Sequence, residues 1–282
     1  AVAGDGATGG VMRVLRKVGG RHIPRWNRYF PRAAGQMKTL GVNAHSPRQV
    51  VYLPSCLTRT FVPSRHMPDQ RPLNEVVASV LAKAGYGIVY PEGLANLCCG
   101  TPFKSKGAQD AADKKVSELE AALLAASDNG RLPVIIDNGV CTAALLDGIR
   151  DPRLQVMDVT RFVHEVAAEH LSFTPQDEQV ALHVVCSMRK KGQAGLLNAL
   201  ARRCATQVLE PQGITCCGFA GDKGFSHPEL NESALNGLRQ QVRDCGSGFS
   251  TSATCEIGLS EHGGIPYQHL MVLVDRATQP RR

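Results

Sequence analysis

Cysteine is the residue type in this chain whose number and spacing offer the most chemistry. Ten cysteines occur among 282 residues, and eight follow a pattern that is written twice: one Cys, then Cys-Cys-Gly, then one Cys. The two copies consist of Cys56, Cys98, Cys99 and Cys141, and of Cys186, Cys216, Cys217 and Cys255. Matching positions are 130, 118 and 114 residues apart, so the copies agree in order but not in loop length. The sequence therefore predicts two related halves with a quartet of thiols in each.

Four thiols that converge on one place can ligate metal. They suit either a [4Fe–4S] cluster or a Cys₄ zinc site. Zinc ligands usually come in pairs about two to four residues apart, and the pattern lacks such pairs. Adjacent cysteines are poorly placed for a disulfide, because their Cα atoms are only about 3.8 Å apart. We predict that the sulfurs of each quartet meet in one pocket, where Gly100 and Gly218 let the backbone turn close to the metal.

The composition indicates where such a chain works. No apolar run approaches the roughly 18 residues of a membrane span, and the start lacks the basic and apolar regions of a secretory signal. We expect a reducing, cytoplasmic compartment, in which cysteines are more often ligands than disulfides. Peripheral attachment to the inner face of a membrane stays open. Cys204 and Cys245, outside the pattern, are interpreted as core or surface residues on helices.

Short apolar or β-branched runs precede the patterned cysteines and predict buried strands. Between these runs, apolar residues recur at helical spacing. Ser226–Glu229 resembles a capping box that opens a helix to about Val242. The fold class predicted is α/β, with two duplicated Rossmann-like parallel-sheet halves related by a pseudo-two-fold axis. The halves are expected over residues 49–171 and 179–277, and ligand sites at the carboxyl ends of their strands. The predicted strands are 49–53, 87–90, 133–136, 180–185, 206–209 and 248–251, and the main predicted helices are 73–84, 108–126 and 196–203.

The positive charge lies at one end of the chain. Residues 1–46 hold eight Lys or Arg and one acid, whereas the rest is neutral, with 24 charges of each sign. A nucleic-acid-binding protein usually carries its charge on the folded body, so we expect no nucleic-acid partner. Residues 1–48 are interpreted as a basic linker that packs on a neighbouring domain, with a targeting peptide or an anionic docking arm as alternatives.

The two Cys-Cys-Gly blocks resemble a known family. Leu-Cys98-Cys99-Gly-Thr-Pro-Phe and Thr-Cys216-Cys217-Gly-Phe-Ala are similar to the CCG cysteine-rich domains of iron–sulfur oxidoreductases, which include one of the subunits of heterodisulfide reductase. Phe225-Ser-His-Pro-Glu-Leu and Thr254-Cys-Glu-Ile-Gly-Leu-Ser look closest to the carboxyl-terminal part of FAD-linked D-lactate and D-2-hydroxyglutarate dehydrogenases. The resemblance covers about residues 49–277.

This resemblance implies an oxidoreductase role. A flavin domain would oxidise a D-2-hydroxy acid and pass electrons through clusters held here toward a downstream acceptor. The chain has no ferredoxin cysteine run and no Gly-rich dinucleotide fingerprint after its first strand. We therefore expect the FAD-binding and ferredoxin-like parts to precede residue 1 or to lie on a partner. We expect no catalytic residue in this chain, which alone is catalytically incomplete.

One departure from the family concerns cluster type. The heterodisulfide reductase pattern closes each motif with Cys-x-x-Cys, whereas Cys141-Thr-Ala-Ala and Cys255-Glu-Ile-Gly hold one cysteine each. Four-cysteine ligation of up to two [4Fe–4S] clusters is therefore expected, with zinc in one half left open. Two rival functions remain at this point: a zinc-stabilised binding scaffold without redox activity, and a thiol/disulfide reductase that uses the Cys-Cys-Gly cysteines directly.

Other polar residues receive simpler interpretations. His183 is expected to be a core histidine, and histidines 227, 262 and 269 have no metal-site spacing. Asp137-Asn138-Gly139 is expected to form a turn. Six basic residues near the quartets either offset the negative charge of a thiolate-ligated cluster, guide an acidic partner, or are solvated: Lys104, Lys106, Arg189, Lys190, Lys191 and Lys223.

Overall fold

The first half of the chain forms a four-stranded parallel sheet. The computed structural model describes residues 5–281, apart from the side chains of residues 5–7. The strands are β2 (Gln49–Leu53), β4 (Gly87–Val89), β5 (Val134–Ile136) and β6 (Val156–Asp158), in the order β4-β2-β5-β6. The connecting helices are α2 (Cys56–Thr60), α3 (Leu73–Lys83), η2 (Leu94–Asn96), α4 (Thr101–Lys104), α5 (Gln109–Ala126), α6 (Gly139–Gly148), α7 (Val159–Glu165) and η3 (Ala167–His170).

The second half repeats this sheet. Its strands are β8 (Gln176–Leu182), β9 (Ala205–Leu209), β10 (Ser247–Ser250) and β11 (Tyr267–His269), in the order β9-β8-β10-β11. Counted along the chain, both sheets have the order 2-1-3-4, and every pair in them is parallel. The helices are α8 (Cys186–Lys190), α9 (Ala194–Cys204), α10 (Lys223–Ser226), α11 (Pro228–Ala234), α12 (Leu238–Gln241), α13 (Ala253–Gly263) and α14 (Leu270–Ala277).

The helices that join the two halves pack reciprocally. Helix α3 of the first half packs on α14 of the second, and α7 packs on α9. Because α9 corresponds to α3 and α14 to α7, exchanging the halves exchanges these two contacts, as a pseudo-two-fold axis requires. One apolar core runs through both halves, and a second core lies under α5. The predicted duplicated α/β fold is confirmed.

Several local predictions were wrong. The stretch predicted as one helix over 226–242 holds two short helices, α11 and α12, because Gly237 turns the chain between them with a φ of +79°. The Ser226 hydroxyl donates to the Lys223 carbonyl and does not cap α11, so no capping box forms. Cys245 is buried in the loop before β10 and not on a helix, whereas Cys204 ends α9 as predicted.

The predicted link at residues 172–178 is mostly strand. It contains most of β7 (Leu171–Phe173) and the start of β8. Strand β7 pairs antiparallel with β12 (Thr278–Pro280), so the end of the chain lies beside the junction of the halves. The strands β6 and β11 were not predicted.

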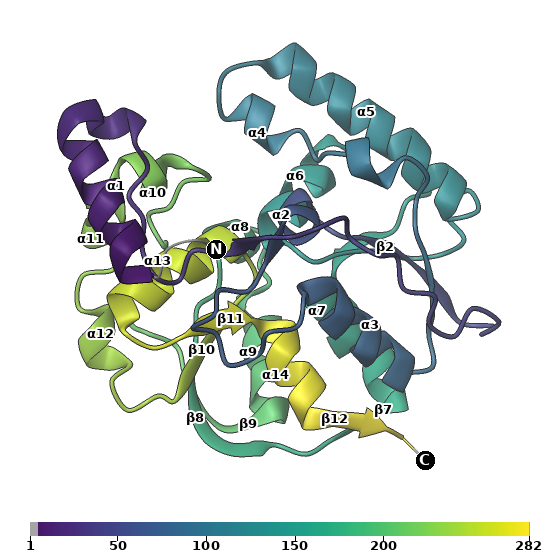
Figure 1. The fold of residues 1–282 in the computed structure, drawn as a ribbon. Helices are drawn as coiled ribbons and strands as arrows, with labels where there is room; N and C mark the ends of the chain where they lie inside the picture. Colours follow the sequence, from purple (N-terminus) through teal and green to yellow (C-terminus); the bar gives the residue numbers. More distant parts are fainter. Residues whose placement is uncertain (1–4, 282) are drawn as a thin grey trace.

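The basic leader folds onto the second half of its own chain. It comprises α1 (Asp5–Gly19), η1 (Gly20–His22) and β1 (Arg32–Ala33), which pairs with β3 (Phe61–Val62). The Arg25 amide donates to the Phe225 carbonyl at 2.7 Å, and Figure 1 shows α1 beside α10 and α11. Within residues 5–281, no helix combines the length and apolarity needed to cross a bilayer.

Candidate metal centres

The first quartet is assembled from loops at the carboxyl ends of the first sheet. Cys56 is the first residue of α2, directly after β2, and Cys141 is the third residue of α6, after β5. Cys98 and Cys99 lie between η2 and α4. All four line one small cavity, and the Cys99 and Cys141 sulfurs are 3.3 Å apart. The structure thus brings together the four cysteines that the repeat singled out.

Three thiols of this quartet, those of Cys56, Cys98 and Cys99, have pKa values raised by burial and by neighbouring thiols. Burial raises the pKa of Cys56, and the neighbouring Cys99 and Cys98 raise it further. A hydrogen bond with Cys99 raises the pKa of Cys98, and the bond with Cys141 raises that of Cys99 to about 11. Four crowded, largely apolar thiols become stable thiolates only beside a strong positive charge. This donor set therefore fits a thiolate-ligated metal or cluster.

The second quartet repeats this arrangement. Cys186 is the first residue of α8, and Cys255 is the third residue of α13. Cys216 and Cys217 lie in the loop between β9 and α10, and the Cys217 and Cys255 sulfurs are 2.8 Å apart. Here Cys217 and Cys255 are buried, whereas Cys186 and Cys216 are exposed.

The Cys216 thiol has a lower pKa than the thiols of Cys186 and Cys217. Hydrogen bonds from Cys186 and Cys217 lower the pKa of Cys216, and the pKa values of Cys186 and Cys217 rise for the same reason. Within residues 5–281, no group of three or more His, Cys, Asp or Glu side chains is set out to hold a single metal ion. The sulfurs of each quartet instead lie against one another.

The glycine of each Cys-Cys-Gly motif is required by the backbone. Gly100 and Gly218 have φ values of +78° and +69°, in the left-handed region that favours glycine. A Cβ would lie 2.7 Å from the Ala112 carbonyl oxygen at Gly100 and 2.2 Å from the Leu230 oxygen at Gly218. Each glycine therefore lets the double-cysteine loop pack against the second helix after it, α5 in the first half and α11 in the second.

An arginine three residues after the first cysteine accompanies each quartet. Arg59 lines the first cavity and donates to the carbonyls of Leu94 and Leu97, the latter at 2.5 Å. Arg189 corresponds to it, but its guanidinium bonds to Glu210 at 2.5 Å. The Nε atoms of both arginines are buried and have no partner among the described residues. Arg59 was missed by the sequence interpretation, although the repeated Cys-x-x-Arg spacing could have revealed it.

Asp137 is a second residue whose role was missed. It follows β5 and is 1% exposed, and it accepts the Tyr52 hydroxyl at 2.5 Å and the Ser55 amide at 2.8 Å. Ser55 in turn caps α2, where Cys56 lies. Burial raises the pKa of the Asp137 carboxyl. Asp137 therefore positions the loop that presents Cys56, and it is more than a turn residue.

The remaining candidates have ordinary partners or surroundings. His183 is a core residue as predicted: it is 2% exposed, burial lowers its pKa to about 4, and its Nδ1 lies 3.4 Å from the Ser250 hydroxyl. Its Nε2, however, has no partner among the described residues. Lys106 and Lys191 pair with Asp222 and Asp147, so these two charges are partly offset by carboxylates.

Solved structures similar to this chain share little sequence with it. One is an aspartate racemase from Picrophilus torridus, with a TM-score of 0.37 and 8% identity, covering 83% of this chain and 96% of that one. Another is an aspartate racemase homologue from Pyrococcus horikoshii OT3, with a TM-score of 0.32 and 10% identity, covering 80% and 96%. No curated protein matches the chain.

The family comparison covers both halves. The model of the cysteine-rich domain named CCG matches residues 50–146 and 180–259, which together are more than half of the chain. The matched ranges hold all eight cysteines of the two quartets, both left-handed glycines and both Cys-x-x-Arg segments. The repeat in the sequence, the repeated sheet and this double match agree, and the chain belongs to the family of CCG cysteine-rich domains.

Proposed function

We propose that this chain is the iron–sulfur electron-transfer part of an FAD-linked D-2-hydroxyacid dehydrogenase, acting after the oxidation of D-lactate or D-2-hydroxyglutarate. The observation that carries the proposal is the convergence of two four-cysteine sets at equivalent sheet edges. Membership of the CCG family is consistent with an iron–sulfur module. The choice of hydroxy acid rests on the resemblance of the segments around Phe225 and Thr254.

Each quartet is a candidate binding site for one cluster, with [4Fe–4S] as the expected type and zinc open for one half. When bound, an iron–sulfur cluster supplies one-electron acceptance and donation, which suits the step after a two-electron flavin oxidation. The chain's own residues would bind and shield it. In the first half, Leu53, Leu97 and Leu119 line the cavity, Arg59 adds positive charge, and Asp137 holds the Cys56 loop.

Partners follow from this proposal. A flavin domain and a ferredoxin-like domain, on the same polypeptide or a partner subunit, would deliver electrons, and a downstream acceptor would receive them. Helix α1 leaves Val11, Val14 and Val18 more than half exposed on one face, a surface that such a domain could cover. We place this assembly in the cytoplasm, with peripheral attachment to the inner face of the membrane as an extension of the proposal.

Metal analysis of anaerobically purified protein tests the proposal. The chain should be brown, with sulfide-to-iron absorption and matching iron and sulfide contents. Cys99→Ser and Cys217→Ser should each remove the metal of one half only. Zinc without iron would indicate a binding scaffold, and metal-free protein that reduces disulfides would indicate a thiol reductase.

Kinetics on the full assembly complete the test. Both variants should leave flavin reduction by the hydroxy acid intact and slow transfer to the acceptor, as seen by anaerobic stopped-flow. Unchanged acceptor turnover in an iron-depleted variant would show that the cysteines are structural. Hydroxy-acid oxidation by residues 1–282 alone would place the active site in this chain and contradict the proposal.

A further inference from the structure

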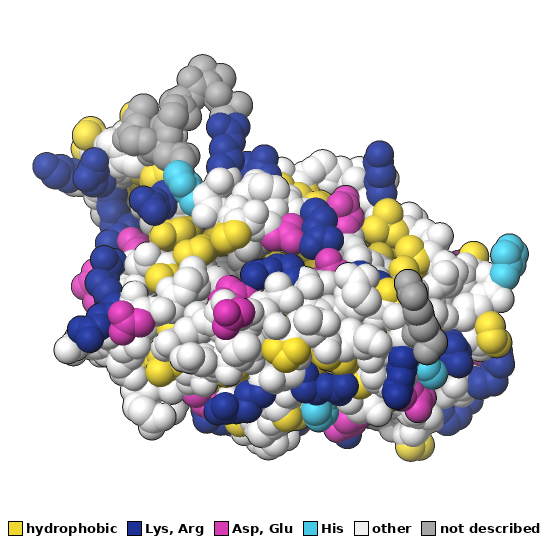
Figure 2. Space-filling view, turned by 90° about the horizontal axis from the view of Figure 1, so that it is seen from below, with side chains coloured by type: hydrophobic (Ala, Val, Ile, Leu, Met, Phe, Trp, Pro, Cys, Tyr) yellow, Lys and Arg dark blue, Asp and Glu magenta, His cyan; other side chains and the backbone are white. Residues whose placement is uncertain are grey.

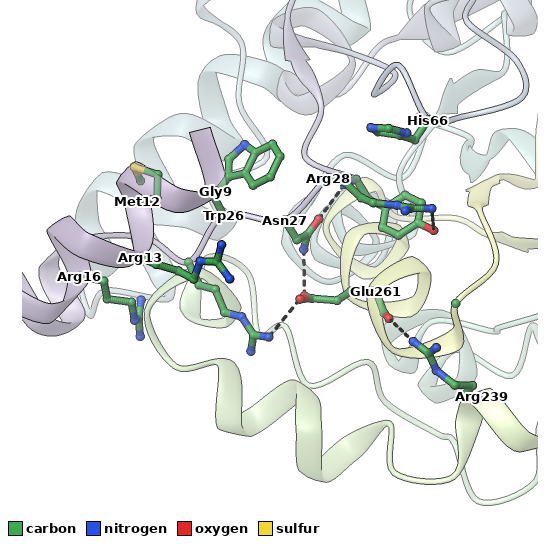
Figure 3. A pocket seen from close by; sticks show the side chains of 13 residues that line it. Gly9, Met12, Arg13, Arg16, Trp26, Asn27, Arg28, His66, Arg239 and Glu261 are labelled. Atoms are coloured by element: carbon green, nitrogen blue, oxygen red, sulfur yellow. Dashed lines mark hydrogen bonds and ion pairs between the residues drawn. The ribbon is translucent and has the colours of Figure 1, made fainter. Parts of the chain in front are cut away.

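A cavity away from the cysteines lies between the leader and the second half. Its volume is about 710 Å³, within the range of small-molecule sites. Helix α1, the segment after η1, and the ends of α12 and α13 form its walls. Figure 3 shows Arg13 and Trp26 on the α1 side, Arg28 and His66 on the other side, and Glu261 between them.

The walls of this cavity are strongly cationic. Among the described side chains, five arginines line it, namely Arg13, Arg16, Arg25, Arg28 and Arg239, against one carboxylate, Glu261. Figure 2 shows Lys and Arg side chains at the end of the molecule where α1 lies, on the left of that view, and others along its lower edge and right side. The leader, with eight Lys or Arg and one acid within residues 1–46, supplies four of the five cavity arginines.

The one carboxylate is already committed. Glu261 binds Arg25 at 3.1 Å and accepts the Asn27 amide at 2.9 Å, and Arg25 also pairs with Glu232 at 3.0 Å. Arg25 is thus neutralised, and Glu261 has little capacity left for another cation.

The charges of four arginines stay without a carboxylate partner among the described residues. Arg16 donates to the backbone carbonyls of Ile23, Phe225 and Ser226, and Arg239 donates to the carbonyl of Glu261. Such neutral acceptors fix a guanidinium without cancelling its charge. Arg28 lies 5.1 Å from the centroid of the Tyr29 ring, and Arg13 has no hydrogen-bond or ion-pair partner in the described part of the chain.

We propose that this cavity is a binding site for a small organic anion that carries two or more carboxylate or phosphate groups. Fixed guanidinium forks match the oxygen pairs of carboxylate and phosphate. Trp26, half-buried in the wall, provides an apolar face for the body of the ligand. The site goes beyond the electron-transfer function, because it contains none of the eight cysteines.

The sole tryptophan of the chain makes the site directly observable, because Trp26 is its only indole. We expect saturable changes in Trp26 fluorescence when the full chain is titrated with citrate, inorganic pyrophosphate or ATP at constant ionic strength. A response to citrate alone would assign a polycarboxylate, and a response to pyrophosphate and ATP would assign a phosphorylated ligand. Calorimetry should give one site per chain.

Matched variants separate the pocket from net charge. Arg13→Gln and Arg28→Gln, both exposed side chains, should each weaken binding about tenfold, as loss of one charge-assisted contact does. Arg202→Gln, an equal charge change on the exposed face of α9, should leave affinity unchanged. The proposal would be overturned by an equal loss in Arg202→Gln, or by no saturable binding of any of the three anions.

The metal-binding proposal and this one can fail separately. A variant with both Cys99→Ser and Cys217→Ser should still bind the anion with unchanged affinity. Loss of anion binding in that variant, with circular dichroism unchanged, would show that the cavity depends on the metal centres and contradict an independent site.

Discussion

The first quartet lies in a largely apolar cavity, whereas the second opens to solvent. Leu53, Leu97, Leu119 and Ile136 surround the first set of sulfurs. Around the second, Cys186 and Cys216 are exposed, and the buried His183 and the Arg189–Glu210 ion pair lie nearby. The backbone geometry is nevertheless the same. Cys56 and Cys186 each begin a helix after equivalent strands, and a glycine with positive φ follows each cysteine pair. Duplication has kept the parts of the site that depend on backbone geometry, while the surrounding side chains have diverged.

The charge next to each quartet differs accordingly. Arg59 is held by two neutral carbonyls and keeps its full charge toward the first quartet, where it lowers the pKa of Cys56 and Cys98 against the effect of burial. Arg189 is paired with a carboxylate, which offsets its charge. We therefore expect two metal centres that share a fold and differ in their electrostatic surroundings.

The same contrast occurs at a buried helix cap. Asp158 caps α7 in the first half, accepting the Thr160 amide at 2.9 Å, and His269 caps α14 in the second, accepting the Met271 amide at 3.2 Å. Burial raises the pKa of Asp158 to about 6 and lowers that of His269 to about 4. Equivalent positions thus hold an acid and a base that both prefer to be neutral when buried.

The largest expected effect concerns the motif glycines. Gly218→Ala should destabilise the chain by about 3 kcal/mol or more, because left-handed strain of about 1–2 kcal/mol adds to a clash with a carbonyl 2.2 Å away. Gly100→Ala, with its nearest carbonyl oxygen at 2.7 Å, should cost less. Urea unfolding of the metal-free protein measures both.

Gly221, in the same loop as Gly218, and Gly107, in the loop after α4, serve as controls. Gly221 and Gly107 also have positive φ values, +76° and +81°, but a Cβ there would meet nothing within 4 Å. Their alanine variants should show the strain alone. Equal costs for Gly218→Ala and Gly221→Ala would refute the close-packing explanation of the Cys-Cys-Gly motif.

The two buried caps, Asp158 and His269, should make the free energy of unfolding depend on pH in opposite directions. The folded-state pKa of Asp158, about 6 against 3.8, means that its stabilising contribution is present below pH 3.8 and lost as pH rises through 6. For His269, about 4 against 6.5, the contribution is present above pH 6.5 and lost as pH falls through 4.

Asparagine at either position keeps a cap without the titration. His269→Asn should therefore lose less stability than the wild type on acidification from pH 6.5 to 4, by at most about 3 kcal/mol. Asp158→Asn should lose more stability than the wild type over the same pH range, because it lacks the stabilisation that Asp158 gains on protonation. Unfolding free energies measured across this range check both signs, and parallel curves for the two variants would contradict the contrast between the halves.

Substitution of the arginines should have a smaller effect, a change in reduction potential of about tens of millivolts at most. If the quartets hold clusters, Arg59→Gln should lower the reduction potential of the first centre, because reduction adds negative charge that Arg59 stabilises. Arg189→Gln should shift the second centre less, and Glu210→Gln should raise its potential by freeing the arginine charge. A redox titration followed by electron paramagnetic resonance separates the two centres, and equal shifts for both arginines would show that Glu210 does not offset Arg189.

The strands before the cysteines and the two quartets could be predicted from the sequence, because both depend on short local patterns. The runs before Cys56 and Cys141 are continuous and apolar, and they form β2 and β5 where predicted. The repeat of Cys, Cys-Cys-Gly and Cys identified both quartets. Arg59 has the same Cys-x-x-Arg spacing as Arg189 and was equally predictable from it.

Other features depend on the folded chain and left no local signal. Strand β11 is only Tyr267-Gln268-His269, too short and polar to stand out, and it is defined by its pairing with β10. Gly237 divides a stretch that otherwise has helical spacing. The Glu210 partner of Arg189 lies 21 residues away on another loop, so only the fold brings the two together.

The smallest expected effect concerns the ion pair that joins the two Cys-Cys-Gly loops. Lys106 lies just after α4, which follows the first motif, and Asp222 lies in the loop that holds Cys217; their charged atoms are 2.8 Å apart with about 60% of each side chain exposed. Exposed pairs contribute about 0–1 kcal/mol and are screened by salt. Lys106→Gln and Asp222→Asn should each change the unfolding free energy by less than about 1 kcal/mol, with a coupling in the double mutant that fades as salt rises. A coupling that persists at about 1 M salt would mean that this contact locks the two loops together, and that the two quartets are mechanically linked rather than independent.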